Sequence, residues 1–465
     1  IDFNWKFFKG NIKGAENVSF NDASWRDVKL PHDWSIEGPF SKNNPSGGEG
    51  GYLPGGIGWY RKHFNLPEED KGKKVFIEFD GVYMNSKVWI NNVYLGNHPY
   101  GYTSFSYDLT PYLNYGDKEN ILAVKVDNSK QPNSRWYSGS GIYRHVWLVT
   151  TDKLHIAHWG TYITTPEVSK KSATIEIKTR VKNEYDVLKK VVLITSIVDK
   201  NDRELKEVKT AHDISGNSEC EFVQSCKIRS PNLWSPDNPY LYRVYTKIEE
   251  TEEVVDNYKT PMGIREFYFD ANKGFFLNGE NIKIKGTCNH HDCGLLGAAC
   301  PDRANERKVE IMREMGCNAI RMSHNPPSPE LLDYCDKYGI LVMDEAFDEW
   351  KRGKLRYGYH EYFDKWATED LKSMIYRDRN HPSIILWSVG NEVLEQGRPE
   401  GVEILKKLVE VVHKEDPTRP VTSACNYIQG ANKTGFADLL DVVGYNYSER
   451  FYEEDHKKYP ERKII

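Results

Sequence analysis

From residue 263 to residue 465, short apolar runs alternate with longer stretches of helical periodicity. The run IKIKGT precedes a helix-like stretch over 302–316, and AIRMS precedes another over 328–339. ILVMDE and SIILWSVG are each followed by a further helical stretch. Strands that alternate with helices pair in parallel, because each helix carries the chain back to the start of the next strand. The pattern predicts a (β/α)8 TIM barrel, and the count of strand beginnings predicts that it is truncated at strand seven.

The first 262 residues show a different pattern. Polar and apolar residues alternate at the strand period in KVFIEFDGV and SKVWINNVYLG, and later in ATIEIKTRVKN and LYRVYTKIEE, with almost no helical periodicity. The first part suits a jelly-roll β-sandwich. The second has the size of an immunoglobulin-like β-sandwich. We therefore expect three domains, over residues 1–152, 153–262 and 263–465.

Composition excludes several classes of protein. The formal net charge of -5 and the pI near 6.3 predict no nucleic acid partner and no binding to an anionic membrane. No apolar run reaches the roughly 20 residues that span a bilayer. The chain begins at Ile1 without a signal peptide, so we expect a processed or trimmed N-terminus, and the compartment stays open between cytoplasmic and periplasmic or secreted.

The eight cysteines form no regular framework, which favours free and mostly buried thiols. The run CNHHDC, Cys288 to Cys293, superficially resembles a zinc site. Structural zinc sites use a second cysteine pair at a distance, and Cys300 stands alone here. We therefore expect no zinc, and a substrate-binding role for at least one of the two histidines.

Polar residues follow the apolar strands of the last domain. HPSIILWSVGNEV is apolar until it ends at Asn391 and Glu392. In a barrel of this kind the chemistry lies at the carboxyl ends of the strands, so the polar strand ends meet at one mouth. Taken singly, each could be a helix cap or a packing residue, and Asp348 is most readily explained so. The set predicts an active site formed by Asn289, His290, His291, Asp292, Ser323, His324, Asn325, Asp344, Glu345, Asp348, Glu349, Asn391, Glu392, Tyr445, Asn446 and Tyr447.

Seven motifs in order carry a family resemblance: LPHDWSIEGPF, MNSKVWINNVYLG, YSGSGIYRHVWL, IKIKGTCNHHD, AIRMSHNPPSPE, MDEAFDEW and NHPSIILWSVGNE. Together they resemble glycoside hydrolase family 2 of the β-galactosidase type, over essentially the whole chain. The resemblance implies a jelly roll, an immunoglobulin-like domain and a (β/α)8 barrel. It also implies hydrolysis of terminal β-D-galactosides with retention, by double displacement. That reaction needs two carboxylates about 5–5.5 Å apart, one as acid/base and one as nucleophile.

The resemblance also implies roles for particular residues. Glu392 would be the acid/base, and Asn391 would bind the sugar 2-hydroxyl. Arg321 would keep the nucleophile's carboxylate ionised, and Tyr447 would donate a hydrogen bond to it. Three further residues that match the family's motifs would bind substrate hydroxyls: Asp33, His290 and His324.

In this family the nucleophile ends strand seven, and the final KII resembles the beginning of that strand. We therefore expect the nucleophilic glutamate a few residues beyond Ile465, and a polypeptide ending there to be inactive. Some members bind Mg²⁺ near the acid/base through a glutamate and a nearby histidine. Glu349 is followed by Trp350 and Lys351 instead, so we expect no metal ligands and no required cofactor, with Mg²⁺ doubtful.

Two alternatives remain open at this stage. The first is a β-glucuronidase or β-mannosidase of the same family, although WSVGNE and HNPPSPE favour a galactosidase. The second is a carbohydrate-binding protein without catalysis, against which Glu392 and the polar strand ends argue. The expected partner is a β-galactoside oligosaccharide or glycoconjugate, and a homo-oligomer is possible.

Overall fold

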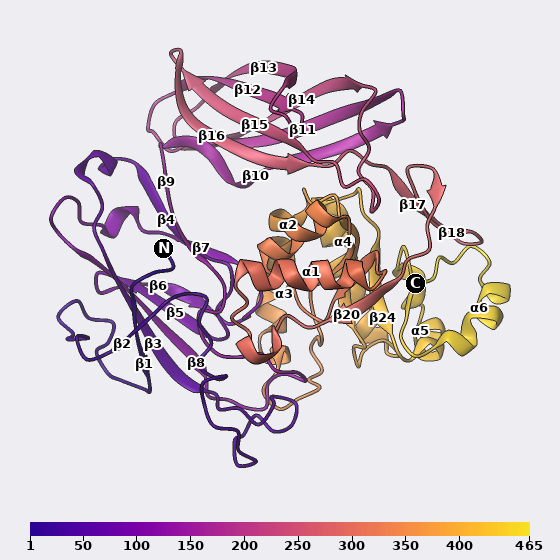
Figure 1. Cartoon of the computed structure of the whole chain (residues 1–465), viewed down its shortest axis with the longest axis horizontal. Coiled ribbons are helices and arrows are strands. Elements are labelled where there is room, and N and C mark those ends of the chain that lie inside the picture. The colour runs from indigo at the N-terminus through magenta and orange to yellow at the C-terminus, as the bar shows by residue number, and fades with distance from the viewer.

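The computed structural model describes residues 1–465. Two β-sandwich regions precede a parallel α/β region, as the sequence predicts. Figure 1 shows the first region beside the helices of the last one and the second region above both. None of the helices combines the length and the apolar character needed to cross a membrane.

The first region consists of two antiparallel sheets. One has the strand order β2-β1-β3-β8-β5-β6 and the other the order β7-β4-β9. Alternation positions the core residues, since every second residue of β4 is buried, and Trp5, Tyr60 and Phe79 from both sheets meet in one cluster. The strands are β1 (Trp5–Lys9), β2 (Arg26–Val28), β3 (Gly56–Phe64), β4 (Lys74–Phe79), β5 (Ser86–Ile90), β6 (Val93–His98), β7 (Phe105–Asp108), β8 (Asn120–Asn128) and β9 (Val146–Thr151).

The second region is also a sandwich, with sheets β10-β11-β14 and β13-β12-β15-β16. Strand β11 pairs with β14 along its whole length, and its alternate residues are buried between the sheets. A small sheet, β17-β18-β19, leads into the last region. The strands are β10 (Leu154–Val168), β11 (Ser172–Asn183), β12 (Lys189–Val198), β13 (Glu204–Ile214), β14 (Ser218–Arg229), β15 (Tyr242–Glu250), β16 (Glu253–Met262), β17 (Phe267–Asp270), β18 (Gly274–Leu277) and β19 (Glu280–Asn281).

The last region is a parallel sheet of six strands in sequence order, with helices between them. Residues 463–465 continue it, because Val443 pairs in parallel with Ile464. All eight residues of β23 are buried, as expected of a strand covered on both faces. The elements are β20 (Gly286–Asn289), α1 (Asp302–Glu314), β21 (Ala319–Met322), α2 (Pro329–Tyr338), β22 (Leu341–Glu345), α3 (Phe363–Asp378), β23 (Ile384–Asn391), α4 (Pro399–Glu415), β24 (Val421–Cys425), α5 (Ile428–Thr434), β25 (Gly444–Tyr445) and α6 (Tyr452–Lys458).

The first region packs firmly against the last one. The Arg144 guanidinium is buried and donates a hydrogen bond to the Pro326 carbonyl at 2.7 Å. The Thr103 hydroxyl donates to the Asp370 carboxylate at 2.6 Å. Because a buried polar group that loses its partner costs free energy, these contacts hold the first region against the loop after β21 and against α3.

His145 makes a further contact between these regions, and its protonation should control that contact. Its ring lies 2.5 Å from an Asp2 oxygen and 2.8 Å from an Asp302 oxygen. The hydrogen bond to Asp2, helped by that to Asp302 and opposed by burial, raises the pKa of His145 to about 10. An unfolded histidine has a pKa of about 6.5. The stabilising effect is therefore complete below pH ~6.5 and is lost as the pH rises to ~10.

We expect the Tm of the His145→Gln variant to lie below that of the unsubstituted protein at pH 6, and the difference to shrink by pH 10. Differential scanning calorimetry at several pH values measures both. A difference in Tm that stays constant from pH 6 to pH 10 would contradict the ion-pair role of His145.

Candidate active site

The carboxyl ends of the parallel strands bring several of the predicted residues together around Glu345, the last residue of β22. This carboxylate is fully buried. It accepts hydrogen bonds from Arg321 Nη2 at 2.8 Å and Ser388 Oγ at 2.6 Å, and His324 Nδ1 lies 2.5 Å away. Burial alone would raise the pKa of Glu345, but Arg321 and His324 outweigh it and lower the pKa to about 2. Glu345 is therefore an ionised anchor for the residues around it.

Arg321 connects this anchor to the end of β23. Its Nη2 atom also donates to Asn391 Oδ1 at 2.8 Å, and Asn391 Nδ2 donates to Asp348 Oδ1 at 2.8 Å. Both ends of the Asn391 amide are thereby held, and the residue is fully buried. The structure thus gives Asn391 one fixed orientation at the strand end.

Glu392 follows directly and is half-buried. Its φ angle of 46° lies in the left-handed region, which side chains other than glycine seldom adopt. Its Oε1 atom accepts a hydrogen bond from Asn446 Nδ2 at 2.8 Å. A strained backbone at a polar strand end is a frequent sign of a functional site, because the surrounding structure must maintain the strain.

Asp348, one of the predicted strand-end residues and the one most readily explained as a helix cap or packing residue, is central to the site. Its carboxylate accepts from Arg135 Nε at 2.9 Å and Nη2 at 2.6 Å, from Lys354 Nζ at 2.9 Å, and from Asn391. Burial opposes ionisation, but Arg135 and Lys354 hold the pKa of Asp348 well below its usual value. Arg135 belongs to the first region, between β8 and β9, so two regions build this part of the site.

His290 and Trp136 form an aromatic wall beside the anchor. Their rings stack with centroids 4.9 Å apart, and His290 Nδ1 lies 2.8 Å from the Ser323 carbonyl oxygen. The Trp136 ring also meets the edge of His324, with centroids 5.7 Å apart. Trp136, Arg135, His324 and Asp348 all line one pocket at this mouth. Flat apolar faces next to hydrogen-bonding groups suit a sugar ring.

Asp33 lies in a different environment from the one expected. It is buried, and both of its oxygens already accept hydrogen bonds from the chain. Oδ1 accepts from the Ser35 and Ser140 amides at 2.9 Å each. Oδ2 accepts from the Tyr137 hydroxyl and from the Ala298 amide at 2.9 Å. In this structure Asp33 joins the first region to the loop after β20, and its contact with a sugar hydroxyl stays a prediction.

That loop is closed by a disulfide between Cys293 and Cys300, with Cα atoms 5.7 Å apart. The expectation that the thiols are all free is therefore wrong for these two. The run CNHHDC resembles a zinc site that contains Cys288 and Cys293, but Cys288 is exposed and free. The bond instead joins Cys293 to Cys300 across a turn that the sequence does not predict. Of the six free cysteines only Cys335 and Cys425 are buried, so the prediction of mostly buried thiols is also wrong.

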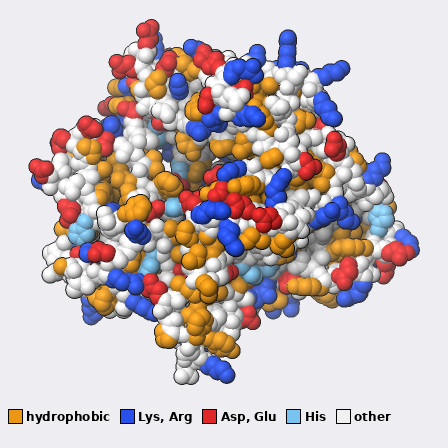
Figure 2. All heavy atoms as spheres, in the orientation of Figure 1, with side chains coloured by type: hydrophobic (Ala, Val, Ile, Leu, Met, Phe, Trp, Pro, Cys, Tyr) orange, Lys and Arg blue, Asp and Glu red, His pale blue; other side chains and the backbone are white.

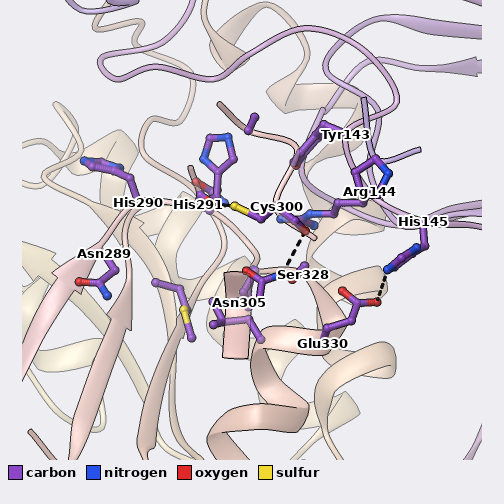
Figure 3. A pocket seen from close by; sticks show the side chains of 16 residues that line it. Tyr143, Arg144, His145, Asn289, His290, His291, Cys300, Asn305, Ser328 and Glu330 are labelled. Atoms are coloured by element: carbon purple, nitrogen blue, oxygen red, sulfur yellow. Dashed lines mark hydrogen bonds and ion pairs between the residues drawn. The ribbon is translucent and has the colours of Figure 1, made fainter. Parts of the chain in front are cut away.

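Behind the aromatic wall lies a second pocket, between the first region and the last one (Figure 3). In Figure 3, Asn289 and His290 lie on one side of it, and His145 and Glu330 lie on the other. His291 also lines it, and burial lowers the pKa of His291 well below the usual value. His291 is partly buried and its ring packs against Tyr102 and Tyr143, whereas His290 stacks on Trp136 at the mouth.

Tyr447 is a further predicted residue that the structure does not bring into the cluster. It is 79% exposed, and its hydroxyl makes no hydrogen bond within the chain. Its φ angle of 52° lies in the left-handed region, like that of Glu392. The predicted hydrogen bond from Tyr447 to the nucleophile stays a prediction.

The carboxylate of Glu349 is held by contacts within the chain. A histidine does lie close, since His360 Nδ1 is 3.2 Å from Glu349 Oε1, although the sequence offered none at the expected place. Both carboxylate oxygens are already occupied, Oε1 by the His360 amide at 3.1 Å and Oε2 by the Lys354 amide at 2.6 Å. A magnesium ion at this carboxylate would have to compete with these contacts for its oxygens, and the expectation that no metal is required stays a prediction.

Comparison with known proteins then decides the family. Residues 271–463 match the TIM barrel domain of glycosyl hydrolases family 2, residues 154–265 match the family's middle domain, and residues 52–152 match its sugar binding domain. The chain belongs to glycosyl hydrolase family 2. The predicted family and its three-domain architecture are confirmed.

The chain is similar to family members with different names. The chain is 49% identical to "Beta-galactosidase BoGH2A" of Bacteroides ovatus, over all of the chain and 58% of that protein. It is 30% identical to a β-glucuronidase of Bacteroides fragilis, over all of the chain and 67% of that protein. The crystal structure of a family 2 member from Bacteroides cellulosilyticus superimposes with a TM-score of 0.97 at 44% identity, covering all of this chain and 60% of the other. The chain thus spans about three-fifths of the length of such relatives.

The disulfide provides a direct test of the loop geometry. In denaturant without reductant, a thiol-reactive dye should label six of the eight cysteines, and after reduction it should label all eight. Closing a loop this short stabilises a fold by about 2 kcal/mol, so Cys293→Ser should lower the free energy of unfolding by about that amount. Labelling of all eight thiols before reduction would contradict the bond.

Proposed function

We propose that the protein containing this family 2 chain is a retaining glycosidase that cleaves terminal β-D-galactosides by double displacement. The observation that carries the proposal is the presentation of Glu392 at the end of a buried parallel strand, on strained backbone, with Asn391 fixed beside it. The similarity to a β-galactosidase over all of the chain supports the choice of sugar.

In the proposed reaction Glu392 acts twice. It first donates its proton to the glycosidic oxygen while the nucleophile attacks the anomeric carbon, so that the aglycone leaves as an alcohol. Glu392 then takes a proton from water, and the resulting hydroxide displaces the nucleophile and releases the sugar. The Asn446 amide on Glu392 Oε1 would keep the other oxygen free for this transfer. The Asn391 amide would meet the sugar 2-hydroxyl.

The nucleophile is proposed to lie beyond Ile465, on the strand that residues 463–465 begin beside β25. Two features support this place. Glu345 is buried and bound by three side chains, so it cannot attack a sugar. Arg321 Nη1 faces Asn446, just after β25, at 3.4 Å, so the guanidinium could reach a carboxylate on the neighbouring strand.

A β-glucuronidase is the second candidate, because the relatives include proteins of that name. Initial rates on 4-nitrophenyl β-galactoside, β-glucuronide and β-mannoside separate the candidates, with the full-length protein as enzyme. We expect the galactoside to be the best substrate and the anomeric configuration to be retained in the product, as followed by NMR. A higher kcat/KM on the glucuronide would replace our choice of sugar, and no turnover of any of the three would support a carbohydrate-binding protein.

Replacing the acid/base tests the role of Glu392. We expect Glu392→Gln to lower kcat/KM for phenyl β-galactoside by about 10²–10⁴-fold, since a poor leaving group needs the proton. The loss should be much smaller with 2,4-dinitrophenyl β-galactoside, whose leaving group departs without help. Glu400→Gln is the matched control, because Glu400 is exposed on α4. Equal losses on both substrates would remove Glu392 from the acid role.

We propose that no metal is required at Glu349, whose carboxylate already accepts hydrogen bonds from the chain on both oxygens. We expect activity to be unchanged after dialysis against EDTA, with titration of Mg²⁺ into the dialysed protein having no effect on kcat. A fall in kcat that added Mg²⁺ restores would contradict the expectation that no metal is required.

A further inference from the structure

The backbone of Asn391 and the peptide that joins it to Glu392 are held at three points. The backbone N–H of Asn391 donates to the Phe347 carbonyl at 2.9 Å, and the backbone N–H of Glu392 donates to the Ala424 carbonyl at 2.8 Å. The third contact comes from a side chain, since Lys354 Nζ donates to the Asn391 carbonyl at 2.7 Å. A left-handed conformation at a residue other than glycine costs roughly 1–3 kcal/mol, so it persists only where such contacts maintain it.

Lys354 is itself fixed. Its side chain is only 8% exposed, and the same Nζ atom donates to Asp348 Oδ1 at 2.9 Å. Burial lowers the pKa of Lys354 and the Asp348 carboxylate opposes that effect. The ammonium group therefore joins two rigid acceptors, of which one is the carbonyl before Glu392.

Asp348 in turn carries this contact to the first region. The Arg135 guanidinium grips both of its oxygens, and a bidentate pair of this kind fixes orientation as well as distance. Trp136, the next residue, stacks on His290. A chain of contacts thus runs from the aromatic wall through Arg135, Asp348 and Lys354 to the peptide before Glu392.

We propose that Lys354 and Arg135, joined by Asp348, are positioning residues for Glu392: they hold the strained peptide that aims its carboxylate and keep two positive charges beside it. The inference rests on the proposed function, in which Glu392 is the acid/base. It assigns to the first region a part in the chemistry, because Arg135 belongs to that region. These three residues form what we call the Asp348 clamp.

If the clamp residues act on Glu392 through their charges, removing a cation and removing an anion should shift the pH dependence of activity in opposite directions. A purely structural role would not produce opposite shifts. A general acid keeps its proton to higher pH when a neighbouring cation is removed, and loses it at lower pH when a neighbouring anion is removed. The charged groups around Glu392 are Arg135, Lys354, Asp348, Arg321 behind Asn391, and Glu49 near Arg135. Lys354→Met should move the alkaline limb of the kcat/KM profile upward, and Asp348→Asn should move it downward.

The experiment uses the full-length protein with phenyl and 2,4-dinitrophenyl β-galactosides. We expect Lys354→Met to lower kcat/KM for the phenyl substrate about 10–100-fold, because proton transfer slows when the acid is misplaced. The decrease in kcat/KM should be much smaller for the 2,4-dinitrophenyl substrate. Lys351→Met is the matched control, since Lys351 is half-exposed on the same segment and pairs with Asp364 outside the site. If Lys354→Met fails to fold, Arg135→Met provides the test, because Arg135 is partly exposed. This variant should show the same upward shift of the alkaline limb of the kcat/KM profile.

The outcomes separate the two proposals. If the unsubstituted protein hydrolyses neither aryl galactoside nor the corresponding glucuronide, the proposed function fails. If it is active, but alkaline limbs in the clamp variants stay in place or all move in one direction, the clamp is structural and this inference is wrong. Opposite shifts for Lys354→Met and Asp348→Asn support it.

Discussion

The site depends on the buried ion pair between Arg321 and Glu345. Each residue belongs to one of two neighbouring parallel strands, and the pair lies where both strands end. Removing one partner of such a pair leaves an uncompensated buried charge, which costs several kcal/mol, so the two strand ends cannot drift apart. Through Arg321 the same pair orients Asn391 on a third strand, and Asn391 immediately precedes Glu392.

The first region contributes side chains to the site at the ends of the parallel strands. Its Arg135 and Trp136 reach the mouth, and its Asp33 binds the disulfide-closed loop through the Ala298 amide. A barrel mouth alone would leave the aromatic wall and the Asp348 clamp unfinished. Acidic and basic side chains are interspersed over the face in Figure 2, which agrees with the small net charge.

Much of this could be predicted from the sequence. The alternation of strands and helices predicted the parallel sheet, and the rule that chemistry lies at the carboxyl ends of its strands placed Glu392, Asn391 and His324 together. These predictions succeeded because each depends on local periodicity and on the position of a residue at the end of its own strand. Asn446 was also among the strand-end residues, although its contact with Glu392 could not be foreseen.

The missed features depend on residues far apart in the chain. Asp348 was predicted among the strand-end residues, but its pairing with Arg135 could not be predicted, because Arg135 lies in another region of the chain. The hydrogen bond from the Ala298 amide to Asp33 could not be predicted either, because only the packed structure brings this loop near, and the contact of Asp33 with a sugar hydroxyl stays a prediction. The cysteine pair across the 293–300 turn was missed for a related reason, since its closure depends on a turn geometry that spacing alone does not give.

The most direct test of the catalytic assignment is to trap the glycosyl-enzyme intermediate. Full-length protein is treated with a 2-deoxy-2-fluoro-β-galactosyl fluoride, and the labelled peptide is located by mass spectrometry. Glu392 as acid/base predicts that the sugar is attached to a glutamate beyond Ile465, with residues 1–465 unlabelled. A sugar attached to Glu392, Glu345 or Glu349 would contradict it.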